Sequence, residues 1–137
     1  LRLRSVRRLP DGPRKSLMTY KGPKVDRVSN ARTEYETAVS DSDTAQKLLE
    51  ALGYRPLAVV DKVRRTYRLG EVTLCLDEVT DLGSFLELEL LVPGEAQRAA
   101  AVARLLALLE ALGVSRERLS RRSYLELLAE KRQGGWR

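Results

Sequence analysis

The sequence predicts an α+β fold in which helices pack outside a mostly antiparallel sheet. Three observations lead to this prediction. Six runs alternate apolar and polar residues, as half-buried strands do. Turn signals of hairpin length join most of these runs. Three further stretches repeat apolar residues at helical spacing, which indicates helices that cover a sheet.

The first part of the chain predicts three strands and a helix. Leu1 to Arg4 alternates apolar and cationic residues, and a turn at 9–13 joins it to a second strand over 16–20. An exposed loop at 24–31 leads to a third strand over 32–39. Residues 41–43 are N-cap candidates for a helix ending at Gly53. Its expected buried stripe is Ala45, Leu48, Leu49 and Leu52.

The remainder predicts three more strands and two helices. Strands over 57–69 and 72–79 form a hairpin, and a turn at 81–84 leads to a strand over 85–92. A long helix is expected from Glu95 to Leu112, with Gly113 after it. Ser123 and Glu126 have the spacing of a capping box that opens a last helix.

The composition limits the classes of function that this chain can have. A length of 137 residues favours one domain over residues 1–137. Lys and Arg number 25 against 19 Asp and Glu, and this +6 surplus favours an anionic partner. The absence of His and the single Cys75 exclude imidazole catalysis, His-ligated metals and an internal disulfide. Because the sequence holds no apolar run near the ~18 residues of a membrane span, we expect a cytoplasmic protein without a membrane partner.

Each predicted strand has one apolar face and one charged face, because side chains alternate along a strand. The apolar faces suit packing against helices. The charged faces collect the cations Arg2, Arg4, Lys21, Arg32, Lys62 and Arg64 and the acids Glu34, Glu36, Asp77, Glu87 and Glu89.

Two interpretations of these faces are open. In the first, the charged faces are the solvated side of an antiparallel sheet. In the second, the sheet curls so that the charged faces converge on a bound ligand. In the second case Arg and Lys would bind a polyanion, since guanidinium suits bidentate phosphate contact. The carboxylates would then bind a hard divalent cation, which prefers oxygen ligands.

Short motifs follow one another in a fixed order along nearly the whole chain. They are LRLR at 1–4, TYKGP at 19–23, RTEYE at 32–36, DKVR at 61–64, LDEV at 76–79, LGSFLELE at 82–89 and RSYLELL at 122–128. This ordered set resembles the CYTH superfamily, the triphosphate tunnel proteins. That superfamily includes class IV adenylyl cyclases, thiamine triphosphatases and inorganic tripolyphosphatases.

The resemblance implies an antiparallel β-barrel, the triphosphate tunnel, with helices packed outside. It implies Mg²⁺ or Mn²⁺ as cofactor. The residues expected to bind the triphosphate are Arg2, Arg4, Lys21, Arg32, Lys62 and Arg64. Those expected to hold the metal are Asp77, Glu87 and Glu89, and those expected to act in catalysis are Lys62, Arg64, Glu34 and Glu36.

One departure from the family pattern concerns the amino terminus. Family members open with a strand bearing Glu-x-Glu-x-Lys, whose acids supply metal ligands, and no such run precedes Arg2. We therefore expect this CYTH-like domain to lack its first strand and helix. An uncovered sheet edge of that kind would be prone to pairing with other strands.

The motifs look most similar to the class IV cyclase branch, which converts ATP to cyclic AMP and pyrophosphate. A tripolyphosphatase and a thiamine or other organic triphosphatase are the alternatives, since fold does not decide substrate. A non-enzymatic polyanion or nucleic-acid binding module is a third reading. With one Trp, five Tyr and one Phe, the sequence offers no evident platform for stacking bases, so nucleic acid is disfavoured. The Ala-rich segment 99–101 could sit at a homodimer contact.

Overall fold

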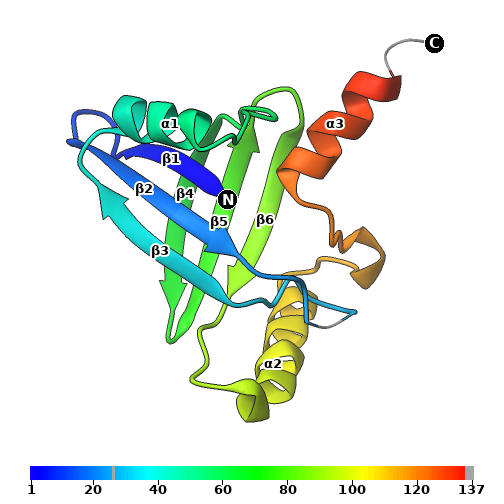
Figure 1. The fold of residues 1–137 in the computed structure, drawn as a ribbon. Helices are drawn as coiled ribbons and strands as arrows, with labels where there is room; N and C mark the ends of the chain where they lie inside the picture. Colours follow the sequence, from blue (N-terminus) through cyan, green and yellow to red (C-terminus); the bar gives the residue numbers. More distant parts are fainter. Residues whose placement is uncertain (26, 135–137) are drawn as a thin grey trace. The chain divides into compact units, whose positions relative to one another are not determined.

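The protein is described by a computed structural model that covers residues 1–25 and 27–134. The chain divides into two units, Leu1–Leu57 (unit 1) and Ala58–Arg137 (unit 2). Each unit contains one three-stranded antiparallel sheet (Figure 1). The predicted α+β class is therefore confirmed. The strands of the described residues form two separate sheets, and no closed barrel is found among them.

Unit 1 contains β1 (Arg2–Arg7), β2 (Arg14–Lys21) and β3 (Glu34–Val39), paired in the order β1-β2-β3. The helix α1 (Ser42–Ala51) follows and lies alongside β1 (Figure 1). Asp41 caps it by accepting a hydrogen bond from the Asp43 N–H at 3.0 Å. Gly53 follows the helix with φ +97°, the left-handed conformation that the sequence predicts at this point.

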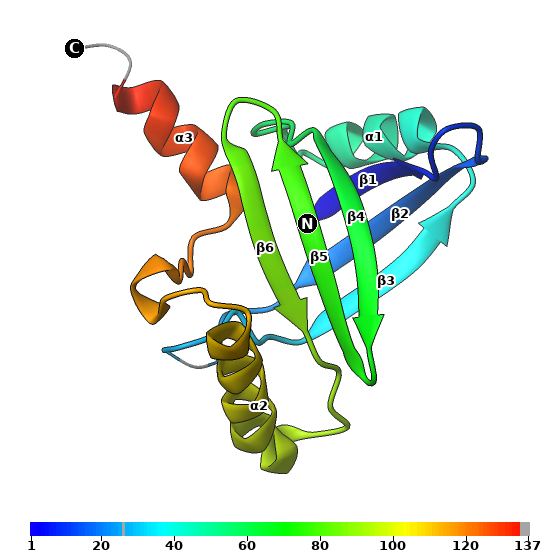
Figure 2. The same cartoon turned by 180° about the vertical axis from the view of Figure 1, so that it is seen from behind.

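Unit 2 contains β4 (Lys62–Leu69), β5 (Val72–Val79) and β6 (Gly83–Glu89), paired in that order (Figure 2). Two single 3₁₀ turns, η1 (Glu95–Gln97) and η2 (Arg116–Arg118), flank the helix α2 (Arg98–Ala111). The last helix is α3 (Tyr124–Gly134). Its predicted capping box is present, because Glu126 N–H donates to Ser123 Oγ and Ser123 N–H donates to the Glu126 carboxylate.

Three strands are shorter than the alternation predicts: β6 ends at Glu89 and not at residue 92, and β4 and β3 begin later than expected. The ladder of β4 begins at Lys62, opposite Val79, where β5 ends, so residues 57–61 have no β5 residue to pair with. On the other sheet, β3 begins at Glu34, opposite Lys21, the last residue of β2. Two backbone hydrogen bonds outside the ladder join the segment between them, from Gly22 N–H to Thr33 O at 2.8 Å and from Val25 N–H to Ala31 O at 3.0 Å.

Burial also departs from the prediction. Val63 and Leu76, on the apolar face of the β4-β5-β6 sheet, are 51% and 42% exposed. On the opposite face Cys75 and Asp77 are 3% and 1% exposed. The charged side of β5 is thus buried at Cys75 and Asp77, because other side chains enclose Asp77 as described below, whereas Val72 is the buried residue of the apolar side.

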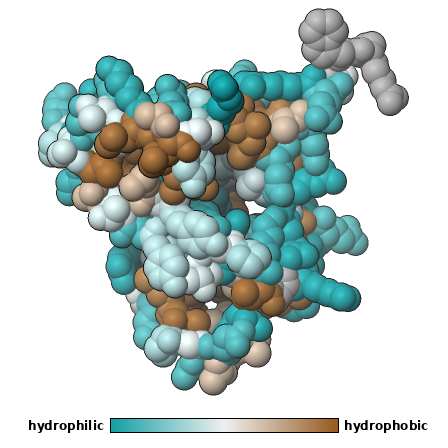
Figure 3. All heavy atoms as spheres, viewed as in Figure 1, coloured by the Kyte–Doolittle hydropathy of each residue, from teal (hydrophilic) through white to brown (hydrophobic). Residues whose placement is uncertain are grey.

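The helix α1 likewise buries less of its apolar stripe than expected. Ala45 and Leu49 are half-buried, whereas Leu48 and Leu52 are 61% and 76% exposed. Successive helical residues turn by about 100°, so contact on one side covers only part of a broad stripe. Hydrophobic residues accordingly lie on the surface in the region of α1 and β1 (Figure 3).

The helices within the described ranges are all too short or too polar to cross a bilayer.

Candidate functional site

The register of unit 2 places five predicted site residues on one face of its sheet. Arg64 pairs with Asp77 across β4 and β5, while Cys75 pairs with Glu87 and Thr73 with Glu89 across β5 and β6. Lys62 lies two residues before Arg64 and therefore shares its face. The residues gathered on this face, the charged face of unit 2, are Lys62, Arg64, Asp77, Glu87 and Glu89.

Asp77 is the centre of this face, and its carboxylate accepts four hydrogen bonds. Oδ1 accepts from Arg64 Nε at 2.6 Å. Oδ2 accepts from Arg64 Nη2 at 2.7 Å and from Lys62 Nζ at 2.8 Å. It also accepts from the Tyr124 hydroxyl at 2.9 Å. A carboxylate at 1% exposure is tolerated here because cations and a hydroxyl satisfy both of its oxygens.

These contacts change the ionisation of the group. Burial by itself would raise the pKa of Asp77, but hydrogen bonds from Arg64, Lys62 and Tyr124 outweigh burial and lower the pKa to about 2. Burial lowers the pKa of Lys62, opposed by its hydrogen bond to Asp77. The hydrogen bond to Asp77 raises the pKa of Arg64. Asp77 is therefore an anion that holds two cations side by side.

Asp77, one of the three expected metal ligands, contacts protein donors in this arrangement. Both of its oxygens are occupied by protein donors, and Arg64 Nη2 also donates to Glu87 Oε2 at 2.8 Å. In the part of the chain that the structure describes, no three Asp, Glu or Cys side chains gather as a metal site. Glu87 and Glu89 remain as two carboxylates two residues apart on β6.

Tyr124 belongs to the same cluster, although it was not among the predicted site residues. Its ring packs against Phe85 with centroids 4.9 Å apart, and Lys62 Nζ lies 5.0 Å from the ring centroid. Burial and the nearby carboxylates of Glu87 and Asp77 raise the pKa of Tyr124. The RSYLELL motif singled out the segment that contains Tyr124. Helical periodicity alone could not predict that this residue contacts Asp77 of β5.

The register of unit 1 gathers a second set of predicted site residues. Arg2 pairs with Thr19 and Thr19 with Glu36, while Lys21 pairs with Glu34. The alternation then puts Arg4 on the same side. The residues on this face, the charged face of unit 1, are Arg2, Arg4, Thr19, Lys21, Glu34 and Glu36.

Thr19 anchors the acids of this face. It is completely buried, and its hydroxyl donates to Glu36 Oε2 at 2.7 Å. Lys21 Nζ lies 3.1 Å from Glu34 Oε1, and Arg4 Nη2 lies 3.9 Å from Glu36 Oε2. Among the residues that the structure describes, none pairs by a hydrogen bond with the buried Arg4 Nε. A buried donor of this kind is the type of group that an anionic ligand satisfies.

Arg32, a predicted phosphate ligand, and the tyrosines Tyr20 and Tyr35 stand apart from this face. Arg32 lies in the segment before β3 and not on the strand itself. Tyr20 and Tyr35 stack with ring centroids 6.0 Å apart. They pair across β2 and β3 next to Thr19 and Glu36, so the alternation sends them to the opposite side of the sheet. Strand packing, and not contact with a ligand on the charged face, is therefore their role.

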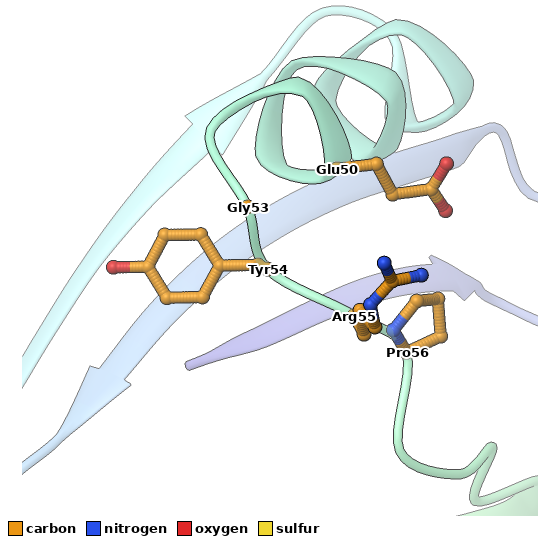
Figure 4. A pocket seen from close by; sticks show the side chains of 5 residues that line it. All are labelled: Glu50, Gly53, Tyr54, Arg55 and Pro56. Carbon is orange, nitrogen blue, oxygen red and sulfur yellow. The ribbon is translucent and has the colours of Figure 1, made fainter.

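A pocket lies where α1 ends, lined by Glu50, Gly53, Tyr54, Arg55 and Pro56 (Figure 4). The Tyr54 side chain points away from Glu50 and Arg55. The lining contains none of the predicted site residues, so the charged face of each unit remains a candidate site in its own right.

Comparison with known families agrees with the motif order. The CYTH domain model matches residues 1–124. This chain belongs to the CYTH family. CYTH proteins generally depend on a divalent metal. Glu87 and Glu89 fit such an ion, because Mg²⁺ in particular is held by one or two carboxylates together with water and substrate phosphates.

Two CYTH relatives carry adenylate cyclase names. The chain is 32% identical over 120 residues to the protein named "Putative adenylate cyclase MJ0240" from Methanocaldococcus jannaschii, and the match covers 88% of this chain and 69% of that protein. It is 32% identical over 111 residues to "Adenylate cyclase CyaB" from Aeromonas hydrophila, covering 81% of this chain and 55% of the relative. The chain thus spans little more than half the length of the second relative.

A solved structure supports the fold assignment. The PH1819 protein from Pyrococcus horikoshii OT3 is 42% identical to this chain and superimposes with a TM-score of 0.83. The match covers 88% of this chain and 68% of the other.

Proposed function

We propose that this CYTH domain binds a triphosphate through its charged sheet faces and acts on it as a divalent-metal-dependent enzyme of the adenylyl cyclase type. The observation that supports this most directly is the pair of cations held by Asp77. Lys62 and Arg64 retain N–H groups beyond those given to the carboxylate, and their side chains are 18% and 26% exposed. A fixed, partly exposed cation pair suits the oxygens of a polyphosphate.

The remaining cations extend the proposed binding set. Arg4 and Lys21 are about one-third exposed, at 30% and 31%, and each has an acid partner that keeps it on the charged face of unit 1. We propose that Arg2, Arg4, Lys21 and Arg32 contribute with Lys62 and Arg64 to phosphate binding, so that residues 1–137 work as one domain. Glu34 and Glu36 would then orient the cations that they contact.

Glu87 and Glu89 are the proposed ligands of Mg²⁺ or Mn²⁺. The bound ion would neutralise part of the phosphate charge, as divalent ions do in phosphoryl transfer. The cations of this chain would stabilise the charge that moves to the leaving phosphate. Arg64 would connect the phosphate-binding cations to the metal-binding acids through its contacts with Asp77 and Glu87.

In the cyclase reaction the 3′ oxygen of the ribose attacks the α-phosphorus of ATP. The bond from the 3′ oxygen to the α-phosphorus forms while the bond from the α-phosphorus to the bridging oxygen breaks. The hydroxyl proton passes to solvent, and cyclic AMP and pyrophosphate form. The names of both relatives favour this reaction. Attack of water on the terminal phosphorus would instead make the domain a tripolyphosphatase or an organic triphosphatase, and only the substrate would distinguish these.

A substrate panel tests the proposal. ATP, inorganic tripolyphosphate and thiamine triphosphate are each supplied with Mg²⁺ or Mn²⁺, and cyclic AMP, pyrophosphate and phosphate are measured. Arg64→Met should abolish turnover. Arg65→Met is the matched control, because Arg65 is the next residue of β4 and lies on the opposite face.

The products decide between the alternatives. Cyclic AMP and pyrophosphate in equal amounts support the cyclase, and phosphate release from tripolyphosphate supports the hydrolase. If no triphosphate is turned over, and RNA binds without metal and with a steep salt dependence, the chain is a polyanion-binding module and the enzymatic proposal is wrong.

A further inference from the structure

We propose that Tyr124, the first residue of α3, is a positioning residue that holds Lys62 and Asp77 in the arrangement needed to bind a polyphosphate. Tyr124 lies outside the predicted binding set, and its positioning role rests on the proposed function of the charged face of unit 2. Tyr124 contacts the cation Lys62 and also Asp77, the anion that binds Lys62.

The two ends of the tyrosine side chain act on different groups. Its hydroxyl donates to Asp77 Oδ2 at 2.9 Å, the same oxygen that accepts from Lys62 Nζ at 2.8 Å. Its ring lies 5.0 Å from Lys62 Nζ, within the range of a cation–π contact. The hydroxyl therefore fixes the carboxylate while the ring faces the ammonium, and Lys62 is confined from two directions.

Tyr124 is itself held in place. Its ring packs against Phe85 of β6, with ring planes at 57°. The helix that carries it is anchored at two further residues on the same side. Leu128 is 5% exposed, and Lys131 Nζ donates to the backbone oxygen of Asp81. The spacing of residues 124, 128 and 131 places all three on one face of α3.

This construction explains how a flexible lysine becomes a defined binding group. A free lysine side chain samples many rotamers, and ordering it on binding reduces affinity. The contacts of Tyr124 and Asp77 restrict Lys62 before any ligand arrives. Removal of the tyrosine should therefore weaken phosphate binding without removing a cation.

The experiment measures binding of inorganic tripolyphosphate by isothermal titration calorimetry. Tyr124→Phe removes the hydroxyl and keeps the ring, and Tyr124→Leu removes both. We expect affinity to fall about 3- to 5-fold for Tyr124→Phe and about 10-fold or more for Tyr124→Leu. Tyr67→Phe is the matched control, because Tyr67 lies on the opposite face of β4 and is 52% exposed.

A second measurement needs no ligand. The ¹⁵N signals of Lys62 Nζ and Arg64 Nε report how firmly these groups are held, and they should broaden or shift in Tyr124→Phe but not in Tyr67→Phe. Lys131→Met loosens α3 at its other end while both tyrosine contacts remain available. Lys131→Met should therefore lose less affinity for tripolyphosphate than Tyr124→Leu does.

The outcomes separate this inference from the proposed function. If the unmodified chain binds neither tripolyphosphate nor ATP, the proposed function is wrong. If it binds, and Arg64→Met weakens binding while both Tyr124 variants bind as the unmodified chain does, the positioning role alone is wrong. Unchanged ¹⁵N signals in Tyr124→Phe would also contradict that role.

Discussion

Arg64 and Asp77 form a two-pronged ion pair across the β4–β5 ladder, with Nε 2.6 Å from Oδ1 and Nη2 2.7 Å from Oδ2. They are directly opposed in the antiparallel register, so the backbone pairing itself brings their side chains together. The pair orients the guanidinium, whose Nη2 also reaches Glu87 on β6. Arg64, held by one buried carboxylate, thus links all three strands of the unit 2 sheet.

Replacement of Asp77 by Asn should destabilise the protein. The variant leaves Lys62 and Arg64 without the anion that compensates their partial burial, which costs about 3 kcal/mol in the free energy of unfolding. Urea denaturation measures this change. Asp61→Asn, at an exposed position, serves as the control and should cost less than about 0.5 kcal/mol. An equal loss in both variants would contradict a structural role for the Asp77 charge.

Stability should decrease in acid through Asp77. Burial opposes ionisation of this group, but its hydrogen bonds prevail, so its pKa falls from 3.8 to about 2 on folding. The stabilisation is therefore fully present above pH 3.8 and is lost as the pH falls through about 2. It amounts to about 2 kcal/mol.

Urea midpoints measured between pH 6 and pH 2 test this dependence. The unmodified protein should lose about 2 kcal/mol more than Asp77→Asn over the acid part of that range, because the variant has no carboxylate to titrate there. Parallel curves for the two proteins would show that Asp77 does not carry the effect.

The two glutamates of β6 should be required for turnover but not for folding. Glu87→Gln or Glu89→Gln removes the charge of a proposed metal ligand, and we expect metal-dependent turnover to fall by about 100-fold or more. Circular dichroism should show an unchanged fold. Glu78→Gln is the matched control, since Glu78 lies on the opposite face of β5. Unmodified rates in both β6 variants would remove these residues from the proposed metal site.

Thr19→Val should destabilise unit 1 while preserving side-chain shape. Thr19 is fully buried and donates to Glu36 at 2.7 Å, so the valine leaves that carboxylate without one of its donors. The expected cost is about 1–2 kcal/mol in the free energy of unfolding, measured by urea denaturation. Thr37→Val, at an exposed position on the other face of β3, should be nearly neutral. The interpretation fails if the two variants are equally stable.

Most of the secondary structure could be predicted from local pattern. Alternation located all six strands, and the apolar spacing with its caps located the three α-helices. The errors lie at strand ends, such as residues 57–61, because a strand extends only as far as its partner does and the partner's end is not encoded locally. The exposure of Leu48 and Leu52 was not predicted for a related reason. The apolar spacing of a helix gives the position of its apolar stripe but not the part of it that a neighbouring element covers.

By itself, then, the sequence determined which residues share a sheet face, because the two-residue period of a strand is a local property of the backbone. It therefore placed Lys62 with Arg64 and Glu87 with Glu89, and the order of its motifs indicated the CYTH family. Only the tertiary structure decided that Asp77 binds Lys62, Arg64 and Tyr124 at once. Those contacts depend on strand register and on where α3 docks, which are set by packing between segments up to 47 residues apart in the chain.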